Sequence, residues 1–225
     1  MPLKNIAIIT ARGGSKRIPK KNIKDFMGKP MLSYAIEAAK GADIFDEIMV
    51  STDSEEIAAI AKKYGANVPF MRSKKTSDDF ATTYDVLDEV ISEYKKTGRE
   101  FDNICCIYPC VPFLSAEILK QAYLEFINSG FDRLTPVIKY SHPIQRALKI
   151  ENGVLKYVEP KHMLTRSQDL EPRYHDVGMF YFYKKDKLLS DSITAYVMDE
   201  KAVQDIDTLE DWQMAQMKYR ILNNV

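Results

Sequence analysis

The sequence contains little cysteine, no surplus of either charge and no long apolar stretch. Its three cysteines, Cys105, Cys106 and Cys110, lie in one short segment without CxxC and histidine partners, which predicts reduced thiols rather than a zinc site or a disulfide framework. Lysine plus arginine (32) equals aspartate plus glutamate (32), so the basic surplus typical of a nucleic-acid binder is missing. No apolar run reaches the roughly 20 residues that span a bilayer. These absences predict a soluble, cytoplasmic protein that binds neither nucleic acid nor a membrane.

Two widespread phosphate-binding motifs are missing as well. The sequence contains neither GxxxxGK followed by Ser or Thr, nor GxGxxG. A P-loop NTPase and a dinucleotide-dependent dehydrogenase are therefore disfavoured.

The apolar pattern alternates between short β-branched runs and helical stripes. Residues 6–10 form a continuous apolar run, as expected of a strand that is buried on both faces. Alternating strands and helices imply a doubly wound, Rossmann-like α/β fold with a mostly parallel sheet, which binds ligands at the carboxyl ends of its strands. The predicted strands are residues 6–10, 48–51, 68–70, 104–108, 134–138 and 179–183. Five helices are predicted: residues 31–40, ended by Gly41; a helix that begins after Asp53 or Ser54 as its N-cap; a helix around 87–94; a helix that begins after Ser115 and ends near Gly130; and residues 209–222.

The alternation of predicted strands and helices is interrupted between about residues 139 and 176. Two short runs, 147–150 and 154–158, flank Asn152-Gly153, and an Asn-Gly pair in that position is typical of a β-hairpin. The rest of the segment is polar, and so long a structureless stretch is unusual inside a compact domain. We therefore expect a single domain over residues 1–225 with an inserted functional arm at about 139–176.

The loop after the first predicted strand is the most informative stretch. Gly13 and Gly14 allow the backbone to approach a ligand and to direct N–H groups at an anion. Five cations among the twelve residues 11–22 could neutralise a triphosphate. A solvated basic turn is the alternative on charge alone, but the position at a strand end favours a ligand site.

The string ARGGSKRIPKKN after an apolar strand resembles the signature loop of the CMP-sialic acid synthetase family, a branch of the sugar nucleotidyltransferases. The resemblance implies a nucleotidyltransferase fold in which Arg12, Lys21 and Asn22 hold the phosphates of CTP. The loop residues that it assigns to nucleotide binding are Ala11, Arg12, Gly13, Gly14, Ser15, Lys21 and Asn22.

Two further segments resemble the nucleotide site of that family. Arg72, Asp79 and Thr83 correspond to a stretch that reaches the cytidine, and Tyr108 lies where many members have glutamine. Cys110 replaces the family's threonine. Because the amide that could bind the cytosine edge is missing, base recognition is expected from backbone groups or from Tyr108.

Asp205 and Asp207 are a candidate metal site. An extended segment places both carboxylates on one side with Ile206 turned inward, and two carboxylates plus phosphate oxygens suit Mg²⁺ or Mn²⁺. The alternative is that Asp207 and Thr208 only cap the last helix, which leaves Asp205 unexplained. The resemblance implies metal binding by both aspartates and a catalytic set of Arg12, Lys21, Asp205 and Asp207.

The arm and the residues after it contain candidate ligands for an acidic sugar. Arginine binds carboxylates through paired hydrogen bonds, which draws attention to Arg146, Arg166 and Arg173. The strings PIQRAL, TRSQDL and YHD-x-G resemble the branch of the family that acts on pseudaminic acid. The sugar-binding residues so implied are Gln145, Arg146, Arg166, Arg173, His175 and Asp176.

The implied reaction is transfer of CMP from CTP to the anomeric hydroxyl of an acidic nine-carbon sugar, with release of pyrophosphate. Pseudaminic acid is the expected acceptor; sialic acid, legionaminic acid or another acidic sugar are alternatives. A non-catalytic nucleotide-sensing module is a rival of another class, and the joint presence of Arg12, Lys21, Asp205 and Asp207 argues against it. The resemblance also implies a homodimer that pairs through the arm.

Overall fold

The computed structural model describes residues 3–224 and centres on a seven-stranded sheet with the order β11-β6-β10-β5-β1-β4, in which β9 also pairs with β6. Strands β4, β1, β5, β6 and β11 point the same way, whereas β9 and β10 run against them. The sheet is therefore mostly parallel, as predicted. The strands are β1 (Asn5–Thr10), β4 (Glu47–Ser51), β5 (Asn103–Ile107), β6 (Arg133–Lys139), β9 (Tyr174–Asp176), β10 (Phe180–Lys184) and β11 (Ile193–Val197).

Helices cover both faces of the sheet, which explains the unbroken apolar run in β1. Ala7 and Ile9 pack in the cluster that contains α1 and α4, whereas Ile6 and Ile8 pack with Leu87 of α3 on the opposite face. A strand that is buried on both sides has no polar alternation. The helices are α1 (Met31–Ala42), α2 (Glu55–Lys63), α3 (Thr83–Lys96), α4 (Ala116–Ser129) and α5 (Leu209–Asn223).

Helix ends coincide with their predicted capping residues at the start of α2 and at both ends of α4, but not at the end of α1. Ser54 caps α2 by accepting a hydrogen bond from the N–H of Ile57, and Ser115 caps α4, which ends at Gly130 with φ of 76°. The expected stop at Gly41 is wrong, because α1 continues past it to Asp43, which adopts φ of 52°. The strand expected at 68–70 is also wrong: only Asn67 makes an isolated bridge, to Met49.

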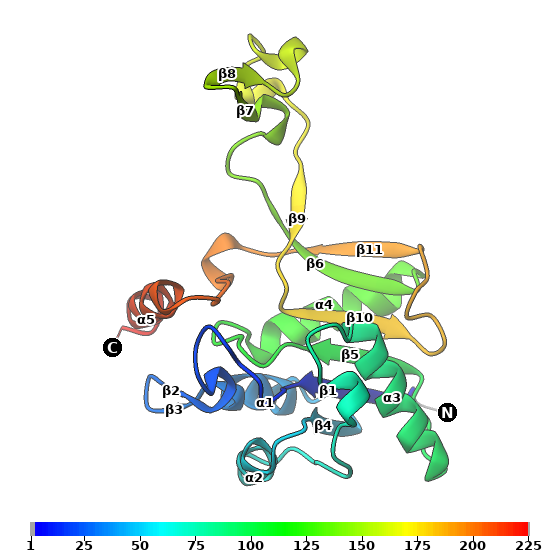
Figure 1. Cartoon of the computed structure of the whole chain (residues 1–225). Helices are drawn as coiled ribbons and strands as arrows, with labels where there is room; N and C mark the ends of the chain where they lie inside the picture. The colour runs from blue at the N-terminus through cyan, green and yellow to red at the C-terminus, as the bar shows by residue number, and fades with distance from the viewer. Residues whose placement is uncertain (1–2, 225) are drawn as a thin grey trace.

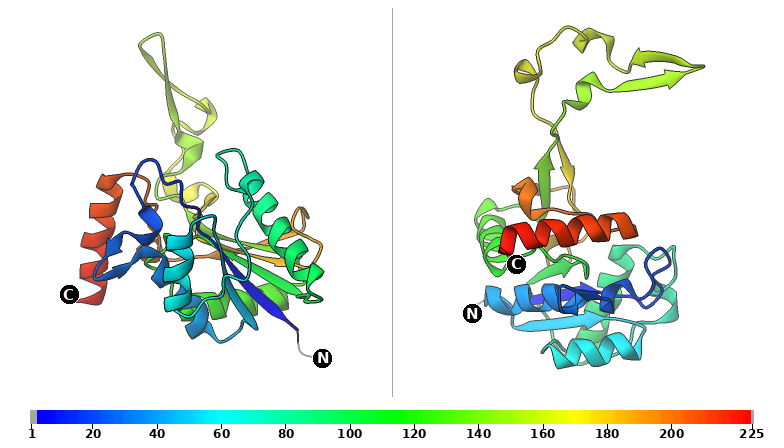
Figure 2. Two further views of the ribbon diagram at one scale, coloured as in Figure 1. Left: turned by 60° about the horizontal axis from the view of Figure 1, so that its bottom comes forward. Right: turned by 90° about the vertical axis from the view of Figure 1, so that its left-hand side faces the viewer.

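A third cluster joins the segment that follows β1 to the C-terminal helix. The β2–β3 ribbon (Asp25–Phe26 and Lys29–Pro30) packs against α5, with the Phe26 ring edge-on to Trp212 at 5.3 Å (Figure 2). Ile18 and Ile206 are buried in the same cluster. This packing places the segment before α5 beside the basic loop, although some 190 residues separate them in the sequence.

The arm projects from the sheet on a two-stranded stem (Figure 1). The stem is the antiparallel pair β6–β9, and the tip contains the hairpin β7–β8 (Leu148–Glu151 and Val154–Tyr157). Asn152 and Gly153 both have positive φ, at 51° and 78°, as a two-residue hairpin turn requires. Both views of Figure 2 show the tip well beyond the core. Short 3₁₀ turns complete the arm: η3 (Ile144–Arg146), η4 (Pro160–His162) and η5 (Ser167–Asp169).

Among residues 3–224, no helix combines the length and the apolar character that a bilayer crossing needs.

Candidate active site

Three adjoining cavities lie beyond the carboxyl ends of β1 and β5. The Arg72 cavity has a volume of about 400 Å³ and also contains Thr83. The loop cavity, of about 360 Å³, is lined by Arg12, Lys21 and other residues of the basic loop, but not by Gly13 or Gly14. The Asp205 cavity, of about 690 Å³, contains Asp205 and Asp207. Pro109, after β5, lines all three. This is the edge of the sheet where an α/β fold binds its ligands.

Internal hydrogen bonds fix the backbone of the basic loop. Asn22 is buried and donates from Nδ2 to the carbonyl of Arg12 at 2.8 Å, while the Cys110 thiol donates to its Oδ1 at 3.3 Å. The N–H of Gly13 donates to Asp53 at 2.7 Å. A Cβ at Gly13 would lie 3.2 Å from the Cβ of Ser54, so glycine is needed for this close approach.

Every cation of the loop has a carboxylate partner. Asp79 accepts from Arg12 at 2.8 Å and from Lys16, and these two donors hold the pKa of Asp79 below its usual range. A polyanion that enters the loop cavity therefore competes with Asp79 and Asp207 for the same cations. The remaining pairs are Arg17 with Asp207 at 2.8 Å, Lys21 with Asp207 at 3.5 Å, and Lys20 with Glu56 at 2.7 Å.

The Arg72 cavity combines a fixed guanidinium with a pair of neutral hydroxyls. Arg72 donates from Nε to Ser51 Oγ at 2.9 Å and from Nη2 to the Ser51 carbonyl at 2.6 Å, and burial lowers its pKa to about 10. It therefore stays charged at neutral pH. Thr83, at the start of α3, hydrogen-bonds the hydroxyl of Tyr108 at 3.0 Å, and burial raises the pKa of Tyr108. The cavity thus offers one rigid positive charge and two uncharged hydroxyls.

Asp205 and Asp207 flank buried Ile206, and both line the Asp205 cavity. Thr208 caps α5, because its Oγ1 accepts from the N–H of Asp211 at 3.1 Å. The carboxylate of Asp207 is therefore not needed as a cap, and it faces Arg17 and Lys21 instead.

The donor chemistry of this pair fits Mg²⁺ or Mn²⁺. Among residues 3–224, no cluster of three or more His, Cys, Asp or Glu side chains surrounds a potential metal position. Two carboxylates leave most of an octahedral shell to water and to substrate phosphates, the arrangement that Mg²⁺ favours.

The sugar-binding candidates divide into two groups. His175 and Asp176 line the Asp205 cavity, together with Lys21. The other four lie farther out along the arm and line none of the three cavities described above. Their contacts are within the arm: Gln145 to the Glu171 carbonyl at 2.8 Å, Arg146 to Ser167 at 3.3 Å, Arg166 to Asp169 at 2.7 and 3.0 Å, and Arg173 to Glu171 at 3.9 Å.

Several residues of the site carry no sequence signal. Lys218 of α5 lines the Asp205 cavity, donates to the Val203 carbonyl at 2.6 Å, and has its pKa lowered by burial. Tyr181 of β10 donates its hydroxyl to Asp176. Cys110, which the sequence indicated only as the replacement of the family's threonine, lies on the cavity wall, and burial raises its pKa to about 12. A lysine within a helix and a tyrosine within an aromatic strand look like ordinary structural residues until the fold brings them to the site.

Comparisons with known proteins agree on one family. A family model described as Cytidylyltransferase matches residues 6–222. A pseudaminic acid cytidylyltransferase of Campylobacter jejuni subsp. jejuni serotype O:2 is 42% identical over 226 residues, which cover 97% of each chain. N-acylneuraminate cytidylyltransferase A of Danio rerio is 34% identical over 94% of this chain and 50% of its own length. Among solved structures, a CMP:2-keto-3-deoxy-manno-octonic acid synthetase complexed with CTP matches with a TM-score of 0.70 at 17% identity, over 99% of this chain and 100% of that one.

The chain belongs to the cytidylyltransferase family and is accordingly a CTP-dependent transferase. The Rossmann-like fold expected from the sequence is confirmed by the shared architecture.

Proposed function

We propose that the protein transfers CMP from CTP to the anomeric hydroxyl of pseudaminic acid and releases pyrophosphate. The observation that carries the choice of acceptor is the 42% identity to a pseudaminic acid cytidylyltransferase across 97% of both chains. The adjoining cavities support the reaction, because a nucleotide and an acceptor can lie side by side with Pro109 and Lys21 between them.

The nucleotide is held by charge and by hydrogen bonds. Arg12 and Lys21 exchange their carboxylate partners for the β- and γ-phosphates. The anion-binding N–H groups expected of the glycine loop are not all available, because the N–H of Gly13 donates to Asp53 and the N–H of Ser15 donates to the Gly13 carbonyl. As the bond between the α-phosphorus and the oxygen bridging to the β-phosphate breaks, negative charge grows on the departing pyrophosphate. Cations beside the β- and γ-phosphates therefore stabilise the transition state more than the ground state. Arg72, Thr83 and Tyr108 bind the cytidine in the Arg72 cavity.

Asp205 and Asp207 would hold the metal, which when bound supplies positive charge to the phosphate oxygens at the reacting centre. The acceptor lies in the Asp205 cavity, with His175 and Asp176 on its wall. Its hydroxyl oxygen attacks the α-phosphorus, the bond from the α-phosphorus to the oxygen that bridges it to the β-phosphate breaks, pyrophosphate leaves with that electron pair, and the hydroxyl proton passes to solvent water. Positioning and charge account for most of the acceleration in such transfers.

The arm suggests a homodimer. Its tip exposes a group of apolar side chains, and Leu155 and Leu164 are 61% and 87% exposed. A monomer in water rarely exposes so many apolar side chains in one small segment. In a two-fold dimer each arm reaches the partner, so that Gln145, Arg146, Arg166 and Arg173 can meet the sugar in the partner's Asp205 cavity. Residues 1–225 then form one catalytic domain with an arm at about 139–176.

A cytoplasmic location fits the cysteines. Cys105, Cys106 and Cys110 are all free thiols, two of them buried, as is usual where the compartment keeps thiols reduced.

The deciding experiment measures pyrophosphate release from CTP with a panel of acidic sugars. We expect turnover with pseudaminic acid to exceed that with legionaminic acid, N-acetylneuraminic acid and the eight-carbon sugar acid of lipopolysaccharide. Preference for another of these sugars would reassign the acceptor, and CTP binding without turnover on any of them would favour a sensing module. A monomeric mass by sedimentation equilibrium would contradict the dimer.

A further inference from the structure

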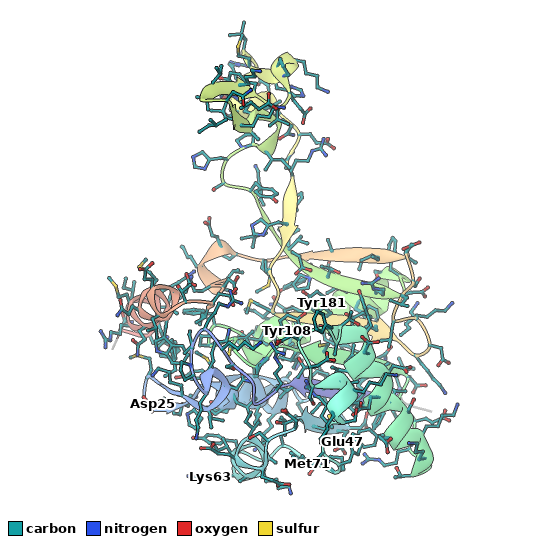
Figure 3. All side chains as sticks on the ribbon, viewed as in Figure 1. Asp25, Glu47, Lys63, Met71, Tyr108 and Tyr181 are labelled. Carbon is teal, nitrogen blue, oxygen red and sulfur yellow. The ribbon has the colours of Figure 1, made fainter. Side chains whose placement is uncertain are left out.

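Tyr181 lies where the arm joins the sheet. It belongs to β10, is partly buried, and donates its hydroxyl to both carboxylate oxygens of Asp176, at 2.9 Å and 3.0 Å. Asp176 is the last residue of β9, the returning strand of the stem. The side chains of Tyr181 and Tyr108 lie next to each other below the base of the arm (Figure 3).

The carboxylate of Asp176 has a fixed direction. The N–H of Gly178 also donates to its Oδ1, at 2.7 Å, across a turn in which Gly178 adopts φ of 62°. Two carboxylate oxygens can accept about four hydrogen bonds. Part of the accepting capacity of Asp176 is therefore available to the Asp205 cavity, which this residue lines.

Tyr181 reaches the cavity only through its neighbours. It is not among the residues that line the three cavities, whereas Asp176 and Tyr108 both line the Asp205 cavity. The ring of Tyr181 meets that of Tyr108 edge-on at a centroid distance of 5.7 Å. Burial, together with the neighbouring Tyr108 and Asp176, raises the pKa of Tyr181, so its hydroxyl remains a donor at working pH.

We propose that Tyr181 is a positioning residue that holds the Asp176 carboxylate toward the Asp205 cavity, where it accepts hydrogen bonds from hydroxyl or N–H groups of the acidic sugar. The inference rests on the proposed function. An acidic sugar carries its own carboxylate, which Asp176 repels, while its hydroxyl and acylamino groups are donors that Asp176 attracts. A carboxylate of fixed direction therefore favours the orientation in which the sugar's hydroxyl or acylamino donors, and not its carboxylate, face Asp176. A carboxylate that rotates freely would select this orientation less strongly.

The test is Tyr181→Phe, which removes the hydroxyl and keeps the ring against Tyr108. Tyr183→Phe is the matched control, because Tyr183 lies two residues along the same strand but faces Tyr84 and Arg133. We expect Tyr181→Phe to raise KM for the sugar about tenfold, as loss of a hydrogen bond to a charged group does. The KM for CTP and the Kd for CTP alone should stay within about twofold of wild type. Tyr183→Phe should change neither.

A double-mutant cycle with Asp176→Asn supplies the second readout. If Tyr181 acts through Asp176, adding Tyr181→Phe to Asp176→Asn should not raise the sugar KM further. Additive effects, equal rises in the KM for CTP and for sugar, or an unchanged sugar KM in Tyr181→Phe would each overturn the inference. Failure of the wild-type enzyme to release pyrophosphate with any sugar would instead refute the proposed function.

Discussion

Replacing Asp207 by asparagine separates its role in the reaction from its role in the fold. Asp207 pairs with Arg17 at 2.8 Å and with Lys21 at 3.5 Å, and its side chain is 36% exposed. Ion pairs exposed to this degree contribute about 0–1 kcal/mol to stability. Thr208 and Asp211 form the capping box of α5, so the helix keeps its cap in the variant. We therefore expect a loss of less than about 1 kcal/mol in the free energy of unfolding.

The effect on turnover should be much larger. In the role proposed for Asp207, the variant would lose both a negative charge and a metal ligand at the reacting centre, where each charge-assisted hydrogen bond contributes about 1.5–3 kcal/mol. Because about 1.4 kcal/mol corresponds to tenfold in rate, kcat should fall at least a hundredfold. The asparagine matches the shape of aspartate, so packing against buried Ile206 is preserved.

The assay is pyrophosphate release at saturating CTP and sugar, across a range of Mg²⁺ and Mn²⁺ concentrations, with urea unfolding in parallel. Asp88→Asn, on the exposed face of α3, is the charge-matched control and should behave as wild type. A kcat for Asp207→Asn within about tenfold of wild type would refute the assignment of this carboxylate to the reacting centre.

Three further predictions test other parts of the site. Arg12→Ala should lower kcat and raise KM for CTP while leaving sugar binding nearly unchanged, and normal CTP kinetics would place the triphosphate elsewhere. Arg166→Ala should raise the sugar KM about tenfold to a hundredfold with unchanged CTP binding, whereas Lys161→Ala on the same arm should not; equal kinetics in both variants would mean that the arm only covers a surface. Because burial raises the pKa of Cys110 to about 12, its thiol stays protonated at pH 8, and mass spectrometry of the folded protein should show alkylation by iodoacetamide at pH 8 that is much slower than that of the urea-unfolded chain; equal rates would contradict the burial of this thiol.

Local chemistry made parts of the fold predictable, and tertiary packing determined the rest. The start of α2 at Ser54 and the end of α4 at Gly130 depend on side-chain and backbone preferences that are written in the sequence. Strand β11 (Ile193–Val197) was not predicted, because it lies at the edge of the sheet and its residues alternate only between exposed and half-buried. Gly41 does not end α1, because the helix continues to Ala42 and Asp43 adopts the left-handed conformation that ends it. A Cβ at Gly41 would lie 3.0 Å from the Cβ of Ala116 in α4, a tight contact that no local pattern reveals.

In the candidate site, too, some residues could be predicted from the local sequence, whereas others are brought together only by tertiary packing. The loop after β1 and the Asp205–Asp207 pair could be singled out because their charges are concentrated in short segments. That Asp207 meets Arg17 follows only from the packing of α5 on the β2–β3 ribbon, which no local pattern predicts. The position of Arg166 relative to the cavities likewise could not be predicted from the sequence, because it depends on the direction in which the β6–β9 stem carries the arm.

The two guanidinium groups of the Arg72 cavity differ in how they can act. Arg12 is 39% exposed and pairs with Asp79, itself 44% exposed, so this pair costs little to break and the cation can transfer to a phosphate. Arg72 is 8% exposed and makes two hydrogen bonds to Ser51, which hold it in one orientation. A fixed donor costs no reorganisation when a base arrives, whereas an exchangeable cation can follow a triphosphate as it binds and as pyrophosphate leaves. In the proposed function, the cavity therefore combines a fixed guanidinium for the base with an exchangeable one for the triphosphate, and Asp79 pairs with the exchangeable one in this structure.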